Sequence, residues 1–553
     1  MPLRSPLSVV LLACALVLSA CGGGSSGAGS SYNNTGSSSS GSGSSSGSGS
    51  SSGSGSSSGS GSSSGSGSSS GSGSSSGSGS SSGSGSSSGG SASGGGCNVT
   101  NTVVTCPPWA WTSGSIFINA NGVYNSQGQP GASNVPGARS GAVSWTDAAG
   151  NLWLFGGQGE DSVGNNAQPL NDLWQYNRSV KQWTWMSGSS TYGALPVYGV
   201  KGTPAPGNVP GVRSGSVSWI DASGNLWLFG GFQQGGGVLT PPSQLLNDLW
   251  EYNPTSREWT WVSGSSAADA NGVYGTQGTA APGNTPGGRF GAVSWLDATG
   301  NLWLFGGFGW DAVASSPNIL NDLWEYSPAS KEWTWISGSS AVNATGVYGT
   351  QGTPGSANVP GARSGAVSWI DASGNLWLFS GCQNVGTAVN TPIDFLNDLW
   401  TYSLKSGQWT WVDGSNTINA YGTYGTKGTP GPGNMPSART GAVSWTDASG
   451  NLWLSGGFGF DSGSSSFNGG FLNDSWVYSS SSKQWTWVSG ANTIDAGGVY
   501  GTQGNSGAGN EPGARSGGVS WTDSSGEVWL FGGFGLDGTG SGNEGYLNDL
   551  WTY

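Results

Sequence analysis

The feature that most constrains the fold of this chain is an internal repeat of 74 to 76 residues. Each copy begins with a segment like Arg-Ser-Gly-Ala-Val-Ser-Trp (139–145) and continues, after a short turn, with Asn-Leu-Trp-Leu-Phe-Gly-Gly (151–157). A variable loop then leads to the segments 170–174 and 183–185. A fixed period of this size indicates a repeat architecture, in which every copy packs against its neighbours. The six copies begin at Arg139, Arg213, Arg289, Arg363, Arg439 and Arg515.

Each copy contains four short apolar segments separated by Gly, Asn, Asp or Pro, which predicts four antiparallel strands, a to d. The second strand places Leu152 and Leu154 on one face and Trp153 and Phe155 on the other. A strand that is apolar on both faces must be covered on both faces. Sheets that pack face to face around an axis satisfy this requirement, so each copy is interpreted as one blade of a β-propeller.

The two ends of the repeat region complement each other. The last copy stops at Tyr553, after its third strand, and therefore lacks a fourth. The missing segment lies before the first copy, at residues 109–113, where Trp109 and Trp111 match the Trp-x-Trp segments of the other copies. We therefore predict an all-β, six-bladed propeller whose ring is closed by strand 109–113 in the last blade. Closure removes an open sheet edge that otherwise invites aggregation.

The pattern resembles that of kelch-type propellers over residues 109–553. The resemblance is carried by the Arg-Ser-Gly start, the Gly-Gly pair after the second strand, and the Asn-Asp-Leu-Trp-x-Tyr and Trp-Thr-Trp segments. Copy four departs at Ser380 and copy five at Ser475. The resemblance implies a fold like the central domain of galactose oxidase, and this fold hosts many activities. The copper chemistry of that relative depends on histidine ligands. This chain has no histidine, so we predict no cofactor.

Residues 1–20 are typical of an export signal, with Arg4 before a short apolar stretch. The stretch ends Leu-Ser-Ala-Cys at Cys21, which resembles the lipobox of bacterial lipoproteins and implies lipidation of that cysteine. Residues 21–96 comprise this cysteine and a Ser/Gly-rich linker, which cannot bury apolar surface and is expected to be a flexible tether. We therefore predict an exported protein that is lipid-anchored at an outer membrane or cell surface, with residues 97–553 as the folded propeller.

Three cysteines follow the lipidation site. Cys97 and Cys106 lie close together before the closing strand, and an oxidising compartment favours a disulfide between them. Cys382 then has no partner and is interpreted as a small, buried apolar residue.

The net charge of −13, without any basic run, argues against nucleic-acid partners and against binding to anionic lipid surfaces. Contact with a membrane is therefore expected through the lipid anchor only. The lack of histidine also removes the commonest general base and transition-metal ligand, so no metal site is predicted. We expect a monomer.

The loops between the second and third strands, the b–c loops, vary in sequence and are candidate binding loops. Trp310 is the one tryptophan outside the repeat pattern, and it precedes an acidic residue. Such a pair can stack on a sugar or anchor a partner, or it can fold back on its own blade. A single calcium site per loop is a further possibility. The candidate residues of these loops are Glu160, Asp161, Trp310, Asp311, Phe460, Asp461 and Asp537.

The first-strand arginines allow two interpretations. The topology gathers them at one end of the propeller, together with an aspartate from each third strand. They can form a structural set of ion pairs, or they can form a mouth that binds anions, as matching arginines do in some kelch domains. The regular repetition favours structure. The arginines retained as ligand-binding candidates are Arg139, Arg213, Arg289, Arg363, Arg439 and Arg515.

These features favour a binding or interaction module for a protein or glycan over an enzyme. The ligand is expected at the end that carries the b–c loops and the long loops between successive blades, the d–a loops. Tyr192 and Tyr421 are off-pattern contact candidates in the d–a loops. The alternatives are a carbohydrate-active enzyme, which needs two converging carboxyl groups, and a purely structural display protein. Acidic residues in suitable loops are Glu160, Asp161, Asp394 and Glu544.

Overall fold

The computed structural model describes residues 97–553 except 165–166, 234–243, 385–392, 464–468 and 524. All regular elements of this part of the chain are β-strands. Within the same residues, no helix has the length and apolar character that crossing a membrane requires. The export signal 1–20, the lipidation site Cys21 and the linker to residue 96 lie outside the described residues, so those predictions stay predictions.

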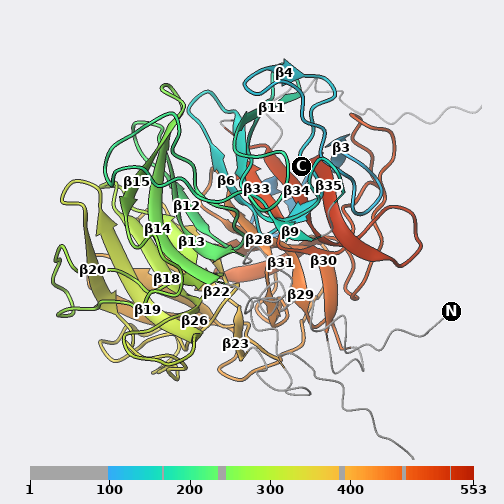
Figure 1. Cartoon of the computed structure of the whole chain (residues 1–553). Helices are drawn as coiled ribbons and strands as arrows, with labels where there is room; N and C mark the ends of the chain where they lie inside the picture. Colours follow the sequence, from blue (N-terminus) through green and yellow to red (C-terminus); the bar gives the residue numbers. More distant parts are fainter. Residues whose placement is uncertain (1–96, 165–166, 234–243, 385–392, 464–468, 524) are drawn as a thin grey trace, which may run out of the picture. The chain divides into compact units, whose positions relative to one another are not determined.

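Six sheets of four main strands follow one another along the chain, and we number them 1 to 6. In every sheet the strands pair antiparallel in the order a, b, c, d (Figure 1). Sheet 1 contains β6 (Val143–Thr146), β7 (Leu152–Phe155), β10 (Leu173–Asn177) and β11 (Gln182–Ser187). Sheet 2 contains β12 (Val217–Ile220), β13 (Leu226–Gln233), β14 (Gln244–Asn253) and β15 (Glu258–Ser263). Sheet 3 contains β17 (Val293–Leu296), β18 (Leu302–Gly309), β19 (Asn318–Ser327) and β20 (Glu332–Ser337).

Sheets 4 and 5 repeat this order, and sheet 6 takes its fourth strand from the start of the described chain. Sheet 4 contains β21 (Val367–Ile370), β22 (Leu376–Phe379), β25 (Leu399–Ser403) and β26 (Gln408–Asp413). Sheet 5 contains β28 (Val443–Thr446), β29 (Leu452–Gly459), β30 (Gly470–Ser479) and β31 (Gln484–Ser489). Sheet 6 contains β33 (Val519–Thr522), β34 (Val528–Leu536), β35 (Glu544–Thr552) and β3 (Ala110–Ser113).

Short strands extend these sheets or stand beside them. The additional strands are β1 (Asn98–Val99), β2 (Val104–Thr105), β4 (Pro130–Gly131), β5 (Arg139–Ser140), β8 (Gln158–Gly159), β9 (Gln168–Pro169), β16 (Arg289–Phe290), β23 (Cys382–Asn384), β24 (Asp394–Phe395), β27 (Arg439–Thr440) and β32 (Arg515–Ser516). The all-β prediction agrees with this element content.

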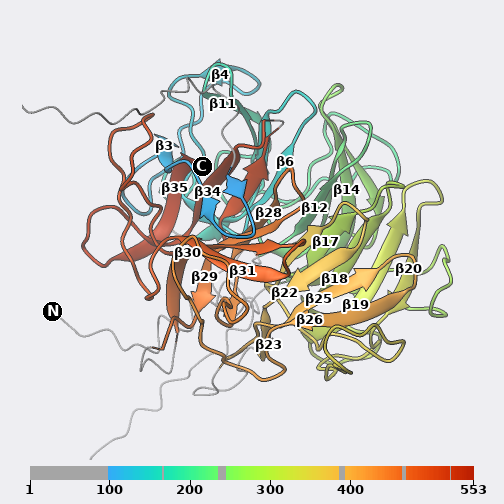
Figure 2. The ribbon, with the colours of Figure 1, turned by 180° about the vertical axis from the view of Figure 1, so that it is seen from behind.

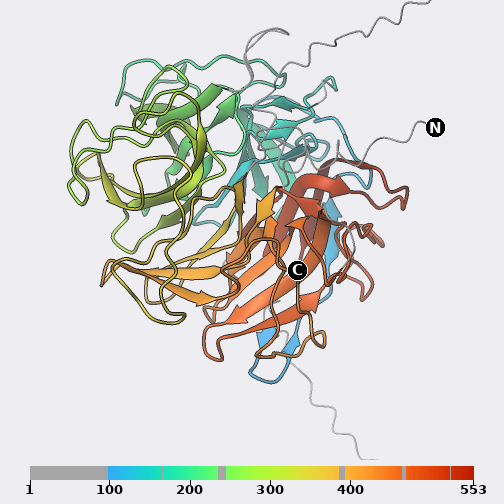
Figure 3. The ribbon, with the colours of Figure 1, turned by 90° about the horizontal axis from the view of Figure 1, so that it is seen from below.

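The innermost strands of the six sheets are joined in a closed ring. The Gly141 N–H donates to the Gly517 carbonyl at 2.8 Å, and the Gly215 N–H donates to the Gly141 carbonyl at 2.8 Å. The same bond recurs from Gly291, Gly365, Gly441 and Gly517 to the preceding glycine of the ring. Because the last bond returns to the first sheet, the structure has the cyclic arrangement of a β-propeller. Figure 3 shows the sheets arranged around a common centre.

The last sheet combines the two ends of the repeat region. Strand β3 pairs antiparallel with β35, with Ala110 opposite Thr552 and Trp111 opposite Trp551. Figures 1 and 2 show the blue β3 beside the red β35. The Trp109 ring stacks on Tyr553 with a centroid distance of 4.4 Å. The pairing predicted from the unmatched ends of the repeat is therefore present.

The apolar core lies between neighbouring sheets. Between sheets 1 and 2, for example, Trp153 and Phe155 pack with Leu228 and Trp250, all at most 1% exposed. Fully burying side chains of this size contributes roughly 1.5–3 kcal/mol each. The second strand is thus covered on both faces, as its apolar pattern indicated.

The two departures from the repeat have local explanations. Ser380 replaces the first glycine of the Gly-Gly pair and keeps its left-handed backbone, with φ of 69° against 64° at Gly156. Its hydroxyl donates to the Leu396 carbonyl at 2.9 Å. In sheet 5, Ser475 lies opposite Ser455, and the two hydroxyls are hydrogen-bonded at 2.9 Å. The departure at Ser475 in the third strand is therefore matched by a second departure, Ser455, in the second strand.

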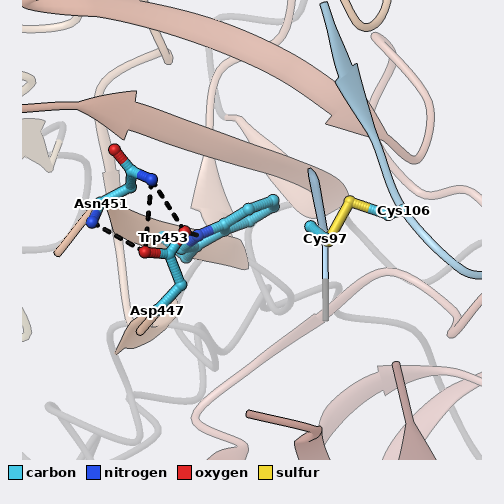
Figure 4. The surroundings of a disulfide bond; sticks show 5 residues. All are labelled: Cys97, Cys106, Asp447, Asn451 and Trp453. Carbon is cyan, nitrogen blue, oxygen red and sulfur yellow. Dashed lines mark hydrogen bonds between the residues drawn. A yellow bond between two sulfur atoms is a disulfide. The ribbon is translucent and has the colours of Figure 1, made fainter. Parts of the chain in front are cut away.

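Cys97 and Cys106 form a disulfide that closes the hairpin of β1 and β2. The Val104 N–H of this hairpin donates to the Gly428 carbonyl at 2.8 Å, outside sheet 5. The disulfide lies beside Trp453, whose indole N–H donates to Asp447 at 2.9 Å (Figure 4). The hairpin therefore covers the outer part of sheet 5 next to the closing strand. Cys382 is fully buried.

Candidate functional site

The six arginines that begin the repeats lie inside the protein. In sheet 1, Arg139 forms a two-pronged ion pair with Asp172, in which both N–O distances are 2.7 Å. Its Nε–H donates to the Gly137 carbonyl, and Nη1 also donates to the Gly156 carbonyl. The other ion pairs are Arg213–Asp248, Arg289–Asp322, Arg363–Asp398, Arg439–Asp474 and Arg515–Asp549. In all six pairs the side chains are at most 5% exposed.

Each of these aspartates binds two further side chains. The Tyr124 hydroxyl and the Trp174 indole N–H both donate to Asp172 Oδ2, each at 2.6 Å. Burial, and then the negative charge of Asp172, raise the pKa of Tyr124 well above its ordinary value. In the fourth sheet, burial opposes ionisation of Asp398, but the Arg363 guanidinium holds the pKa of that carboxyl below its ordinary value. The recurrent tyrosine of the d–a loop therefore anchors that loop to the sheet.

The geometry supports the structural interpretation of the arginines and not the anion-binding mouth. Each guanidinium is buried, is paired with a carboxylate and donates to backbone carbonyls as well. A buried charge that keeps its partner is satisfied, and removing one partner from such a pair typically costs about 3–5 kcal/mol. The positive charge that could have bound an anionic ligand is therefore neutralised by an aspartate of the same sheet. The buried ion pairs therefore favour the framework role for Arg139, Arg213, Arg289, Arg363, Arg439 and Arg515, which is the alternative that the regular repetition also favoured.

The loop aspartates also have internal partners. Asp311 is 2% exposed, and its carboxylate accepts the Val313 N–H at 2.8 Å and the Val342 N–H at 2.9 Å. Burial raises the pKa of Asp311, but these backbone N–H groups outweigh it and hold the pKa below its ordinary value. Because Val342 belongs to the next d–a loop, this carboxylate joins two loops. Asp161 and Asp461 make the same type of link, to the Tyr192 and Ile494 N–H groups, and Asp537 accepts the Thr539 N–H.

The residues before these aspartates are also held by the fold. The Trp310 indole N–H donates to Asp269 at 3.0 Å, and its ring packs against the apolar cluster beneath the loops. Phe460 is 5% exposed and contacts Phe395 and Tyr421 edge to face. The interpretation in which these residues fold back on the protein therefore fits better than direct ligand contact.

Glu160 is the one carboxyl at this loop position. It is 1% exposed, and within the described part of the chain its Oε2 has no hydrogen-bond partner. Burial, and then the neighbouring Asp161, raise its pKa above the ordinary value. The other acidic candidates stand elsewhere: Asp394 pairs with Asn384 in a short sheet, and Glu544 begins β35. Among the residues that the structure describes, no group of three or more His, Cys, Asp or Glu side chains is arranged to hold a metal ion.

The loop-rich end exposes the two tyrosines that the sequence indicated and a set of valines that it did not. Tyr192 and Tyr421, the two off-pattern tyrosines, are 48% and 45% exposed. Five of the six d–a loops also expose a valine at one equivalent position, and each of these side chains is at least 42% exposed. Each valine is joined to the opposite side of its loop by its backbone, which leaves the side chain outside. These residues are Val123, Val197, Val273, Val347 and Val499.

Comparison with known proteins agrees with this fold. A family model described as the KLHDC2/KLHL20/DRC7 Kelch-repeats domain matches residues 125–344, which is less than half of the chain. A solved structure entitled "Structure of YjhT" is similar, with 14% sequence identity and a TM-score of 0.43, over 75% of this chain and 95% of that chain. The strand order and the closed ring of glycine hydrogen bonds define the folded part as an all-β propeller, and its residues 125–344 are similar to a kelch-repeats domain.

Proposed function

We propose that the protein is an exported, membrane-tethered binding module whose loop-rich end binds a partner protein. The observation that carries the proposal is the exposure of Tyr192, Tyr421 and the repeated valines on the d–a loops, while the charged repeat residues are internal. Exposed apolar groups that recur on one end of a protein are typical of interaction surfaces, and tyrosine is enriched at such surfaces. A kelch propeller supports this assignment, because the fold commonly serves as a rigid platform for binding loops.

The carbohydrate-active alternative has less support. It needs two carboxyl groups on either side of a sugar bond. Asp161 and Asp311 instead accept backbone N–H groups within the loops, and Glu160 is buried. A glycan ligand, the other possibility raised by the sequence, remains an outcome that the experiment below distinguishes.

The test compares one loop-end variant with a control at the opposite end. The double substitution Y192S/Y421S removes both exposed aromatic rings, and V180S removes a 56% exposed side chain from a c–d turn. Binding of purified chain to surface and secreted proteins from the same cells is measured by interferometry, in parallel with a glycan array. We expect at least a tenfold loss of protein binding in the double variant and no change in V180S. Equal binding by both variants, or binding to glycans alone, would contradict the proposal.

The membrane anchor is tested separately. Substitution of Cys21 by serine removes the thiol that would carry the lipid, so the protein should move from the membrane fraction to the soluble fraction of the exported material. Incorporation of a labelled fatty acid should be lost in the same variant. A C21S protein that still sediments with membranes would show that another segment holds it there.

A further inference from the structure

Two grooves lie beside the a–b and c–d turns, where the d–a loops run back along the outer strands. One lies beside the outer strand of sheet 4, against sheet 5, and has a volume of about 430 Å³. The other lies beside sheet 2, against sheet 3, and has a volume of about 380 Å³. Their walls are built from equivalent repeat positions. The groove of sheet 4 is lined by Gly352, Asp371, Trp377, Thr401, Val412 and Lys483, among others.

The equivalent place beside sheet 5 is filled by the chain itself. There the hairpin of β1 and β2 packs its Cys97, Val99, Val104 and Cys106 side chains into the apolar cluster that contains Trp453, Val477 and Val488. Its backbone joins the sheet through the Val104 N–H, which donates to the Gly428 carbonyl at 2.8 Å. Figure 4 shows the disulfide of this hairpin beside Trp453. The β1–β2 hairpin therefore serves as an internal example of a peptide segment bound in this kind of groove.

The groove of sheet 4 offers the same backbone to a ligand. Gly352 has a φ of 75°, against 77° at Gly428. Both N–H groups donate to the outer strand at 2.7 Å, to Trp411 and Trp487 respectively. A Cβ at Gly428 would lie 3.1 Å from the Val104 carbonyl oxygen, whereas no atom of the described residues lies within 4 Å of a Cβ at Gly352. The place that Val104 occupies beside Gly428 is thus open beside Gly352.

The side chains of the two open grooves differ at one decisive position. Sheet 5 has Val477 beneath the hairpin, sheet 4 has Thr401, and sheet 2 has Glu251. The Thr401 hydroxyl is buried and has no hydrogen-bond partner among the residues that the structure describes. Burial, and then the negative charge of Asp221, raise the pKa of Glu251 above its ordinary value. A carboxyl group in this position disfavours burial of a ligand's apolar side chain beside it, whereas threonine has nearly the shape of valine.

We propose that the groove of sheet 4 binds a single extended peptide strand of a partner protein, whose side chains in the groove are uncharged and mostly β-branched. The strand takes the place that β2 has beside sheet 5 and donates one backbone N–H to the carbonyl of Gly352, in the d–a loop that runs along the outer strand. Sheet 6 lacks the c–d turn, which leaves room for both strands of the hairpin on sheet 5. Beside sheet 4 the c–d turn of sheet 5 is present and borders the groove with Ser480 and Lys483, so the proposed ligand is a single strand.

Lys483 adds a preference for charge. Its side chain is exposed and stands at the wall of the groove. An ammonium group in this position attracts a carboxylate at the end of the bound strand, with a gain that salt screens. The site includes Gly352 of a d–a loop, but it uses neither the tyrosines nor the valines of the proposed function and does not depend on that function.

The experiment titrates the full chain with acetyl-Asn-Thr-Val-Val-Thr-amide, the sequence of residues 101–105, by isothermal calorimetry. We expect one site, at least a tenfold loss of affinity in T401E, and a second site in E251T. The same peptide with a free carboxylate should bind more tightly at low salt, and K483S should remove that difference. Thermal melts of each variant establish that it is folded.

Four results would overturn the proposal. Three are the absence of saturable binding at millimolar peptide, binding that is unchanged in T401E, and a single site in E251T. Unchanged affinity in T401E would mean that the peptide displaces the chain's own hairpin on sheet 5. Competition by a neutral oligosaccharide at equal strength would assign the groove to sugars instead.

Discussion

Sheets 3 and 6 make the same contacts, although sheet 3 is one continuous stretch of chain and sheet 6 combines both ends of the repeat region. In sheet 3 the Asn284 side chain donates to the Trp333 carbonyl at 3.1 Å, and in sheet 6 Asn510 donates to the Trp109 carbonyl at 3.1 Å. The Gly278 and Gly504 N–H groups bind the outer strand at 2.8 and 2.7 Å. The outer strand is therefore held by its d–a loop as much as by the c–d turn that connects it to the third strand.

What sheet 6 lacks is the c–d turn, which in sheet 3 tethers the outer strand to its neighbour. An untethered strand at a chain end is prone to fray. The disulfide hairpin that precedes β3 compensates, because it fixes the chain to Gly428 before the strand begins. In sheet 6, the attachment of the hairpin to Gly428 therefore takes the place of the c–d turn that holds the outer strand of the other sheets.

The largest expected effect concerns the two equivalent tryptophans of the outer strands. Trp109 is 2% exposed and Trp333 is 1% exposed. Replacement of either by alanine leaves a cavity of similar size, so we expect both W109A and W333A to lose about 3–5 kcal/mol of unfolding free energy. Urea unfolding of the two variants measures this. A cost for W109A that is several-fold smaller than for W333A would mean that the closing strand is only loosely attached.

The disulfide should have a smaller effect. It closes a short loop, with a sequence separation of 9, and its removal frees the end of the closing strand. We expect the double variant C97S/C106S to lose about 1–3 kcal/mol of stability. Thermal unfolding with and without reductant checks this, and C382S serves as a control for general cysteine effects. No change in melting temperature would show that the hairpin does not clamp sheet 6.

The smallest expected effect depends on pH. Glu511 stands in the d–a loop of sheet 6 where the other repeats have Val, Thr or Met, and burial raises its pKa to about 7 from 4.5. The folded state binds the proton of the Glu511 carboxyl group more tightly than the unfolded chain does. The stability that this protonation contributes is therefore full below about pH 4.5 and is lost as the pH rises through 7. We expect E511V to be more stable than the natural chain by about 1–2 kcal/mol at pH 8.

Denaturant unfolding of both proteins between pH 4 and pH 9 measures this difference. The stability of E511V should vary less above neutral pH than that of the natural chain. If the two curves run parallel, the carboxyl group does not titrate between the folded and unfolded states as its burial implies.

The sequence predicted much of the fold because its repeat is nearly regular. The position of Trp109 and Trp111 before the first repeat indicated the closing pair with β35, and the double-faced pattern at Leu152–Phe155 indicated covered sheets. The role of Tyr124 could not be found in the same way. Its aspartate lies 48 residues further along the chain, and only the packed d–a loop brings the hydroxyl to it.

The candidate site was harder to predict, because burial decides the role of a polar residue. Asp311 and Trp310 have the composition of a binding loop, but the Val342 N–H and Asp269 that engage them come from distant parts of the chain. The groove of sheet 4 depends on Thr401 standing where another repeat has glutamate. That difference is visible in the sequence, but its meaning depends on the hairpin that fills the same place on sheet 5.

Ring closure requires β3 to be a stably paired strand of sheet 6, and amide hydrogen exchange tests this pairing most directly. The exchange rates of residues 110–113 are compared with those of residues 332–337 in the continuous sheet 3. We expect comparable protection in the two strands, lost only when the whole propeller unfolds. Rapid exchange at residues 110–113, with sheet 3 fully protected, would show that the N-terminal strand does not close the ring.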